Sequence, residues 1–169
     1  MIAERRAYYH SPIGIIEILG TKQGLTAVNF VRRRPREANT LDPALRAVLV
    51  QIDEYFRGKR REFSLVLNLE GTDFQKKAWQ QLVRIPYGRT ATYAEVAAAV
   101  GRPEAARAVG QANHRNPISI IVPCHRVIGS GGRLVGYGGG LWRKEWLLAH
   151  ERRNVAGGET DGLTRRKRT

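Results

Sequence analysis

The first part of the chain carries a pattern of apolar residues that is typical of strands. Residues 14–19 and 25–30 are rich in residues that favour extended structure, and the short polar segment between them ends at Gly24. Glycine suits such a turn because it adopts backbone angles that other residues avoid. The pattern predicts an antiparallel hairpin within residues 8–30.

A helical spacing follows this hairpin. Asp42 and Pro43 fit the N-cap and the first position of a helix, and apolar residues then recur every three or four positions up to Phe56. Residues 63–69 return to a period of two, which predicts a further strand. We therefore expect residues 1–71 to form a small α/β domain.

Two capping boxes open the second part of the chain. Thr72 is followed by Gln75, and Thr92 by Glu95, so each pair can satisfy two backbone donors at a helix start. A Gly-Arg-Pro segment separates the second of these helices from another that we expect over residues 103–114. Two short helices joined in this way have the form of a helix-turn-helix.

The end of the chain combines a glycine-rich loop, a helix and a basic tail. Residues 129–140 hold many glycines but neither a P-loop nor a dinucleotide fingerprint, so the sequence does not favour a nucleotide cofactor. A last helix is expected over residues 142–151, which closes a second domain at residues 72–151. Residues 152–169 lack apolar periodicity and end in a run of basic side chains, which predicts a disordered tail.

Composition narrows the classes of function. The net charge is +14 and is distributed along the whole chain, which favours a polyanionic partner such as nucleic acid. The single cysteine excludes an intrachain disulfide and suits a reducing cytoplasm. No signal-peptide pattern begins the chain, and no apolar run approaches the ~20 residues of a membrane span, so no membrane partner is expected.

The candidate chemistry lies at Cys124. This residue follows an apolar run and a proline and precedes His125, which could act as the base that removes the thiol proton. Neighbouring residues of a strand point to opposite faces, so a bridging water is expected between the two groups. Glu145 and Glu151 are both available to orient the imidazole, and spacing alone does not choose between them. The alternative is a buried structural cysteine at the end of a strand.

The motifs of the second domain resemble those of the O6-alkylguanine-DNA alkyltransferases (methylated-DNA–protein-cysteine methyltransferases). The resemblance extends over residues 72–151 in order and spacing. It implies a ribonuclease-H-like N-terminal domain and a winged-helix-like C-terminal domain with a helix-turn-helix. The matching segments are Pro86-Tyr87-Gly88, Thr92-Tyr93, Ala105-Ala106-Arg107-Ala108-Val109-Gly110, Asn116-Pro117, Pro123-Cys124-His125-Arg126-Val127, Tyr137-Gly138-Gly139-Gly140-Leu141 and Lys144-Glu145-Trp146-Leu147-Leu148.

This resemblance implies direct repair of double-stranded DNA. The family binds the minor groove and rotates the damaged guanine out of the stack. Its cysteine then takes the alkyl group from O6 of guanine, or from O4 of thymine, in an irreversible step that each molecule performs once. The reaction consumes no cofactor. The resemblance further implies a monomer that could cluster on DNA, in the cytoplasm and on the nucleoid when bound.

The resemblance also assigns the catalytic residues. Cys124 is the alkyl acceptor, and His125 is its base through a bridging water. Glu151, rather than Glu145, matches the carboxylate that pairs with this histidine. Asn116 matches an asparagine that holds the turn and the hydrogen bonds of the site.

Further residues match the base pocket and the DNA-binding surface of the family. Tyr93 matches a tyrosine that acts on N3 of the leaving guanine, and Arg107 matches the arginine that fills the gap left in the stack. The remaining pocket residues are Val127, Tyr137, Gly138 and Gly139, and the remaining DNA-binding residues are Arg89, Thr90, Ala106, Ala108 and Gly110.

Two departures from the family are informative. Many members carry serine where this chain has Gly138, and the smaller residue is expected to widen the pocket toward bulkier alkyl groups. Some members bind zinc through cysteines near the N-terminus, but no cysteine precedes Cys124 here, so no metal site is expected. Two other functions fit the residues less well, namely a lesion-binding module without transfer and a Cys-His hydrolase.

Overall fold

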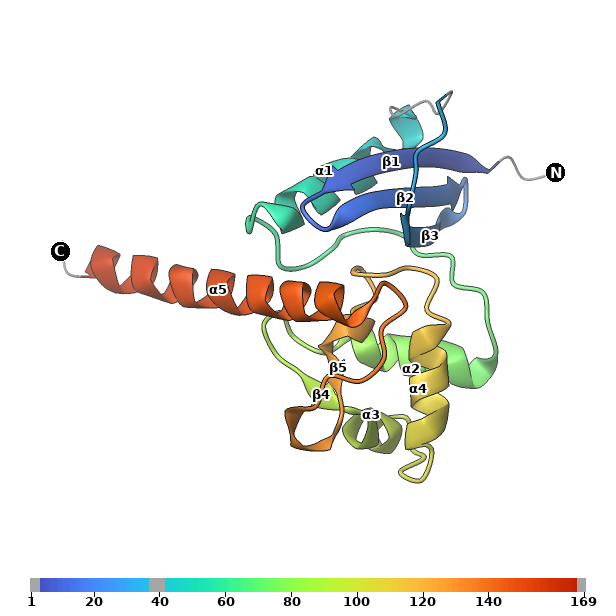
Figure 1. Cartoon of the computed structure of the whole chain (residues 1–169), viewed down its shortest axis with the longest axis vertical. Coiled ribbons are helices and arrows are strands. Elements are labelled where there is room, and N and C mark those ends of the chain that lie inside the picture. Colours follow the sequence, from blue (N-terminus) through green and yellow to red (C-terminus); the bar gives the residue numbers. More distant parts are fainter. Residues whose placement is uncertain (1–3, 37–41, 167–169) are drawn as a thin grey trace.

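The N-terminal part of the protein is a three-stranded antiparallel sheet with one helix against it. The computed structural model describes residues 4–36 and 42–166, with side chains as far as residue 157 (Figure 1). The expected hairpin is present, and a strand that the sequence pattern did not predict precedes it. The sheet order is β1-β2-β3, with β1 at Arg5–Ser11, β2 at Gly14–Thr21 and β3 at Gly24–Val31.

The helix of this domain begins one turn later than its cap suggests. Asp42 accepts a hydrogen bond from the Ala44 backbone, but Pro43–Leu45 form a 3-10 turn, and α1 proper spans Arg46–Phe56. Its apolar face packs against the sheet and is buried with it. Gly58 has a positive φ and ends the helix, as expected for a C-terminal glycine.

The segment at residues 63–69 is not a regular strand, which corrects the prediction. Leu67 alone forms a bridge, with Leu25, and the Leu25 backbone is bonded to Val66 and Asn68. Leucine or phenylalanine recurs at every second position of residues 63–69 because the connection is extended, and every second side chain packs against the core. A period of two therefore reports an extended backbone here and not membership of a sheet.

The C-terminal part begins with three helices. Both predicted capping boxes are present. The last of the three helices begins later than expected, because Ala105 N donates to Arg102 O and Pro103 takes the second position of a turn. The helices are α2 at Asp73–Val83, α3 at Tyr93–Ala99 and α4 at Ala106–His114.

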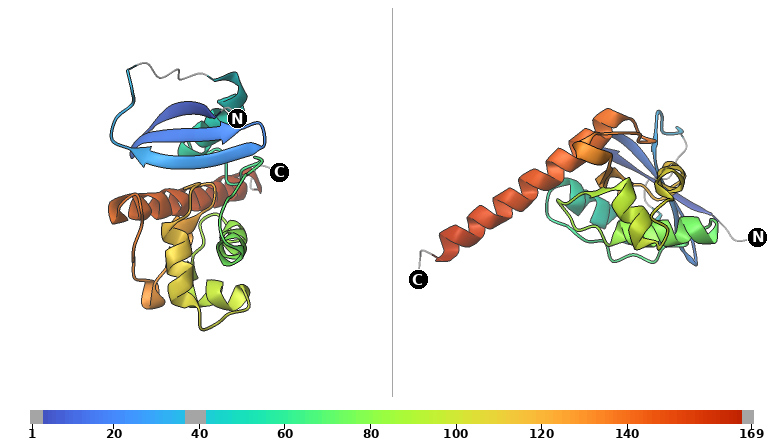
Figure 2. Two further views of the ribbon diagram at one scale, coloured as in Figure 1. Left: turned by 90° about the vertical axis from the view of Figure 1, so that its right-hand side faces the viewer. Right: turned by 90° about the horizontal axis from the view of Figure 1, so that it is seen from below.

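The long helix α5, at Leu141–Arg166, lies between the sheet domain and the helices of the C-terminal part (Figures 1 and 2). It continues well past residue 152, where the sequence predicted disorder; the last three residues lie outside the described part. Arg61 donates to the Asn154 carbonyl oxygen, and Val155 approaches Gly88 closely. Contacts with residues far away in the sequence therefore hold the helix at Asn154 and Val155, beyond its apolar stripe.

Two short elements carry the segments between the helices. β4 at Ala91–Thr92 pairs in parallel with β5 at Val127–Ile128, and a 3-10 helix, η2, spans Cys124–Arg126. Another 3-10 turn, η3, lies at Ser130–Gly132. The pairing of β4 with β5 places the segment after the cysteine beside the start of α3.

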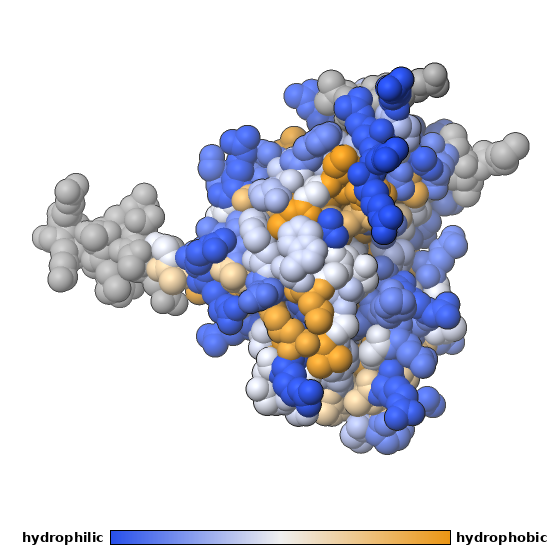
Figure 3. Space-filling view, viewed as in Figure 1, coloured by the Kyte–Doolittle hydropathy of each residue, from blue (hydrophilic) through white to orange (hydrophobic). Residues whose placement is uncertain are grey.

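Hydrophilic side chains cover much of the face shown in Figure 3, with small apolar patches between them. Among the described residues, no helix has the length and apolar character needed to cross a membrane. Within residues 4–36 and 42–157, no three histidine, cysteine or acidic side chains gather where they could hold a metal ion.

Candidate active site

A tight turn presents Cys124, in place of the buried strand considered as an alternative. Asn116 holds this turn from within, because its Nδ2 donates to the Val122 carbonyl oxygen at 2.8 Å and its Oδ1 accepts from the Ile118 backbone at 3.0 Å. Ile120 has a φ of 72°, a conformation that is unfavourable for a β-branched residue. The turn leads directly into η2, whose first residue is the cysteine.

The Cys124 thiol is buried and interacts with Asn116. The Asn116 Nδ2 lies 3.2 Å from Sγ, so one amide group both fixes the turn and donates to the sulfur. Burial raises the pKa of the Cys124 thiol, while the Asn116 hydrogen bond and the charge of Lys144 act to lower it. The net effect is a raised pKa, so the resting sulfur is a protonated thiol that needs a base.

His125 and Glu151 form a buried pair behind the cysteine. The His125 Nε2 lies 2.7 Å from Glu151 Oε1, and both side chains are fully buried. Arg126 completes the cluster with bonds of 2.9 Å from Nη2 to Oε1 and from Nε to Oε2 of the same carboxylate. The structure thus brings Glu151 to the histidine, whereas Glu145 lies exposed on the other side of α5.

This geometry sets the tautomer of His125. Burial lowers the pKa of the imidazole more than Glu151 raises it, so the ring is neutral at rest. Glu151 stays ionised, because His125 and Arg126 outweigh the effect of burial and hold the pKa of its carboxyl far below the usual range. The carboxylate can only accept, so Nε2 carries the proton. Nδ1 is buried and accepts no hydrogen bond from the described protein groups, which leaves it available as a base.

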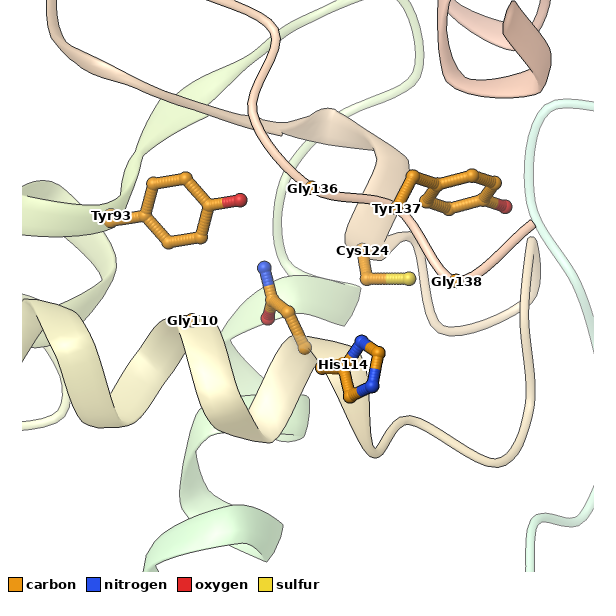
Figure 4. A pocket seen from close by; sticks show the side chains of 8 residues that line it. Tyr93, Gly110, His114, Cys124, Gly136, Tyr137 and Gly138 are labelled. Atoms are coloured by element: carbon orange, nitrogen blue, oxygen red, sulfur yellow. The ribbon is translucent and has the colours of Figure 1, made fainter. Parts of the chain in front are cut away.

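A cavity of about 50 Å³ lies in front of the thiol (Figure 4). Tyr93 projects from α3 toward the loop at Gly136, and the Cys124 thiol points toward the loop at Gly138. The volume exceeds that of one water but leaves little room for more than a few. The lining residues are Tyr93, Gly110, Asn113, His114, Cys124, Gly136, Tyr137 and Gly138.

The glycine-rich loop is bonded to both sides of this cavity. The Tyr93 hydroxyl donates to the Val135 carbonyl oxygen at 2.9 Å, and the buried Lys144 donates to the Val135 and Gly136 carbonyl oxygens. Arg143 donates to Gly139 O at 2.6 Å. These bonds hold the loop over the thiol in this conformation.

The same arginine connects the loop to the N-terminal domain. Arg143 donates to the Ile13 carbonyl oxygen at 2.7 Å, and its guanidinium lies over the rings of Phe30 and Trp142. A Cβ at Gly139 would meet the Phe30 ring at 2.9 Å, so glycine permits this close approach. No Cβ contact restricts Gly138, where open space surrounds the backbone.

The residues expected to contact DNA lie in the first half of α4 and on the loop before β4. Arg107 is exposed and lines a surface groove of about 420 Å³ together with Gly110, Gln111, His114 and Arg115. Gly110 and His114 line this groove and the cavity at Cys124 alike, so the two are adjacent. Ala106 and Ala108 are partly buried, and Arg89 and Thr90 are exposed.

The structure gathers most of the predicted site residues and adds others. Cys124, His125, Glu151 and Asn116 form one buried cluster, and Tyr93, Tyr137 and Gly138 line the cavity beside it. Val127 is buried in β5, directly after η2, and Gly139 approaches Phe30 instead of lining the cavity. The sequence interpretation did not identify Tyr55, Asn113, Arg126, Lys144 or Arg143 as parts of the site.

Two of these missed residues carried a local signal, since Arg126 lies inside the Pro-Cys-His-Arg-Val motif and Lys144 begins the Lys-Glu-Trp-Leu-Leu segment. The side-chain amide of Asn113 has both polar atoms buried without a hydrogen-bond partner in the described structure. It lies close enough to Tyr93 to lower the pKa of that phenol, although burial has the larger effect and raises it.

Comparisons with known proteins agree with this architecture. Residues 5–69 match the family model of the ribonuclease-like domain of 6-O-methylguanine DNA methyltransferase, and residues 73–153 match that of its DNA-binding domain. A methylated-DNA–protein-cysteine methyltransferase of Methanosarcina barkeri is 49% identical over 150 residues, which cover 86% of this chain and 95% of that protein. The chain therefore belongs to the 6-O-methylguanine DNA methyltransferase family.

Solved structures of the family have the same fold. The crystal structure of the Mycobacterium tuberculosis O6-methylguanine methyltransferase superposes with a TM-score of 0.81 at 41% identity and covers 90% of this chain and 94% of its own. A crystal structure of Mycobacterium tuberculosis OGT in complex with DNA matches with a TM-score of 0.80 at 46% identity and covers 88% of this chain and 93% of its own.

Proposed function

We propose that this protein repairs alkylated DNA by moving an alkyl group from O6 of guanine to the sulfur of Cys124. The observation that carries the proposal is the buried Asn116–Cys124 and His125–Glu151–Arg126 arrangement beside a cavity, in a chain of the methyltransferase family. The product is a thioether, which does not hydrolyse under ordinary conditions. Each molecule therefore acts once.

The first step is removal of the thiol proton. His125 Nδ1 accepts that proton through a bridging water, and the imidazolium that forms is stabilised by Glu151 behind it. Asn116 and Lys144 stabilise the thiolate by a hydrogen bond and by charge. The thiol of Cys124 and the imidazole of His125 are both neutral at rest, so their charges appear only when the reaction begins, in a site where water is largely excluded.

The second step is displacement at the alkyl carbon. The thiolate attacks this carbon while its bond to O6 breaks, and the electron pair stays on the guanine, which then takes up a proton. Tyr93 acts on the leaving base from the opposite side of the pocket. Its hydroxyl is bonded to Val135 in this structure, so it exchanges that partner for the base when the base enters.

In this proposal α3 and α4 form a helix-turn-helix that binds DNA. We infer that α4 enters the minor groove, where Ala106, Ala108 and Gly110 permit close approach. Arg107 is exposed beside the cavity entrance, which suits a side chain that fills the gap left by the rotated base. The base itself requires the loop over Cys124 to open, because the cavity holds only a few waters in volume.

Several finer features of the proposal rest on the family resemblance. Tyr137 stacks on the base, the backbone of Val127 and of Gly138 and Gly139 reads its edge, and Arg89 and Thr90 contact the phosphates. The protein acts as a monomer in the cytoplasm, where a free thiol persists. Residues 1–71 support the site, residues 72–151 carry out catalysis, and residues 152–169 add general affinity for DNA.

A titration tests this function. Duplex DNA with one O6-methylguanine is mixed with increasing amounts of protein, and the unmodified guanine that forms is counted. We expect one guanine restored per protein molecule and no more after longer incubation. Continued repair beyond that ratio would contradict transfer to the protein itself. Tight lesion binding with no guanine restored would indicate a lesion-binding module instead.

A further inference from the structure

Glu151 has a hydrogen-bond partner from the other domain. The hydroxyl of Tyr55, in α1, donates to Glu151 Oε1 at 2.8 Å, at the same oxygen that binds His125. Glu151 Oε2 accepts from the Gly88 backbone at 3.2 Å, in addition to Arg126. Both carboxylate oxygens are thus enclosed by donors, and one of those donors comes from the N-terminal domain.

The orientation of Tyr55 is fixed by its surroundings. The side chain is fully buried, and its ring contacts those of Phe56, Phe63, Tyr87 and His150 on different sides. His150 is adjacent to Glu151 in α5, and its Nε2 lies 2.8 Å from the Tyr55 carbonyl oxygen. The ring therefore has little freedom to turn its hydroxyl away from the carboxylate.

The phenol of Tyr55 stays protonated from acidic to neutral pH, so it remains a donor over the range in which the transfer reaction is followed. Burial raises the pKa of Tyr55 well above its ordinary value, and the charge of Glu151 raises it further. A hydrogen bond to an ionised acceptor is stronger than one between neutral groups. The phenol thus draws electron density from the oxygen that orients His125.

We propose that Tyr55 is a positioning residue for alkyl transfer, through which the N-terminal domain sets the orientation of Glu151 and the basicity of His125. The inference rests on the proposed transfer function. Tyr55 is not among the residues that line the cavity, and its hydroxyl contacts the catalytic cluster through the hydrogen bond to Glu151. It gives the N-terminal domain a part in the chemistry, although that domain supplies no reacting group.

The titratable groups around His125 and Glu151 determine the direction of the effect. Besides the neutral phenol of Tyr55, they are the cations of Arg126 in η2 and Lys144 in α5 and the neutral phenol of Tyr87 after α2. Removal of the Tyr55 hydroxyl leaves all of them in place and deprives Oε1 of one donor. The carboxylate then binds the His125 proton more strongly, which raises the pKa of the imidazole and leaves less of the neutral base at low pH.

The test compares Tyr55→Phe with Tyr9→Phe. Tyr9 is the matched control, because its hydroxyl donates to the carboxylate of Asp53 in the same helix, α1, at 3.0 Å, so Tyr9→Phe removes a bond of the same kind at a different acid. Transfer from O6-methylguanine in duplex DNA is measured as a single-turnover rate between acidic and neutral pH. We expect the acid limb of the Tyr55→Phe profile to move to higher pH, with transfer about tenfold slower on that limb, and the Tyr9→Phe profile to match the parent protein.

A second substitution at position 55 should move the acid limb of the rate profile in the opposite direction. Incorporation of a ring-fluorinated tyrosine at position 55 retains the hydroxyl and makes it a stronger donor, so the acid limb should move to lower pH. Coincident profiles for the parent, the fluorinated protein and Tyr55→Phe would overturn the proposal, as would shifts in the same direction for both changes. A loss of folding in Tyr55→Phe leaves the fluorinated protein to decide.

The reaction of Cys124 with iodoacetamide is recorded over the same pH range. This reaction needs neither DNA nor alkyl transfer, so it separates the two proposals. A shifted thiol profile in a protein that does not repair DNA would refute the proposed function and leave the role of Tyr55 intact. If the parent repairs DNA normally, and neither Tyr55→Phe nor the fluorinated protein shows a shifted pH profile, only the role of Tyr55 is refuted.

Discussion

Replacement of Glu151 by glutamine tests the buried cluster behind Cys124. The substitution preserves the size of the side chain but removes its charge. It also replaces one carboxylate oxygen by an NH₂ group, which cannot accept from the groups that donate to that oxygen of Glu151. Arg126 then remains buried, with only 5% of its surface exposed, and has no carboxylate partner. The Ile85 carbonyl oxygen still binds its Nη1, at 2.7 Å, but does not neutralise the cation.

The expected loss of stability is large because the cluster is dry. Removal of one member of a buried ion pair typically costs about 3–5 kcal/mol, since the remaining charge is left without compensation. In a protein of this size, such a change lowers the melting temperature by roughly 10 °C. Alkyl transfer should slow as well, because the imidazolium of His125 loses the charge that stabilises it.

The effect also has a defined pH dependence. The native pKa of Glu151 lies far below its ordinary value, so its charge contributes stability above the pKa of the unfolded chain. This contribution is lost as the pH falls through the acidic range, because the unfolded chain takes up its proton first. The difference in unfolding free energy between parent and Glu151→Gln should therefore narrow as the solution is acidified.

Urea unfolding followed by tryptophan fluorescence at several pH values measures this difference. Glu145→Gln is the matched control, since Glu145 lies on the same helix and is exposed to solvent. It should unfold like the parent within about 0.5 kcal/mol. Equal unfolding free energies of Glu151→Gln and Glu145→Gln at neutral pH would refute the stabilising role of the Glu151 charge. A difference between parent and Glu151→Gln that grows as the pH falls would also refute it.

Three other substitutions examine separate parts of the site. Asn116→Ala removes the hydrogen bond that lowers the pKa of the Cys124 thiol, so reaction with iodoacetamide should be about tenfold slower at neutral pH; an unchanged pH profile would argue against that contact. Arg107→Ala should slow repair of duplex DNA at least about tenfold, since base rotation costs a few kcal/mol, but leave reaction with free O6-benzylguanine unaffected, and equal losses would exclude a role in rotation. Gly138→Ser should slow transfer from O6-benzylguanine more than from O6-methylguanine, and the same ratio of rates in both proteins would show that glycine does not widen the pocket.

Sequence patterns predicted those helices and strands that are determined by residues close together in the chain. The capping boxes at Thr72 and Thr92 were identified because each needs only two residues three positions apart. Strand β1 was missed because its partner residues lie in β2 and its own segment has a weaker pattern. The continuation of α5 was also missed, because Asn154 and Val155 are held by contacts with residues far away in the sequence.

The same distinction applies to the site. Cys124, His125 and Asn116 lie within one short segment, and their motif made them visible. The choice between Glu145 and Glu151 was open on spacing and required either the family resemblance or the fold. Tyr55 lies 96 positions from Glu151, and no periodicity or motif in the first domain indicates that its hydroxyl reaches the carboxylate.

The central claim is that the sulfur of Cys124 receives the alkyl group, and an intact mass tests it most directly. The protein is incubated with duplex DNA carrying O6-methylguanine, and its mass is compared with that of Cys124→Ala treated in the same way. We predict a gain of one methylene in the parent, located by peptide mapping at Cys124, and no gain in the variant. An unchanged mass in a protein that binds the lesion, or a gain that persists in Cys124→Ala, would contradict the claim.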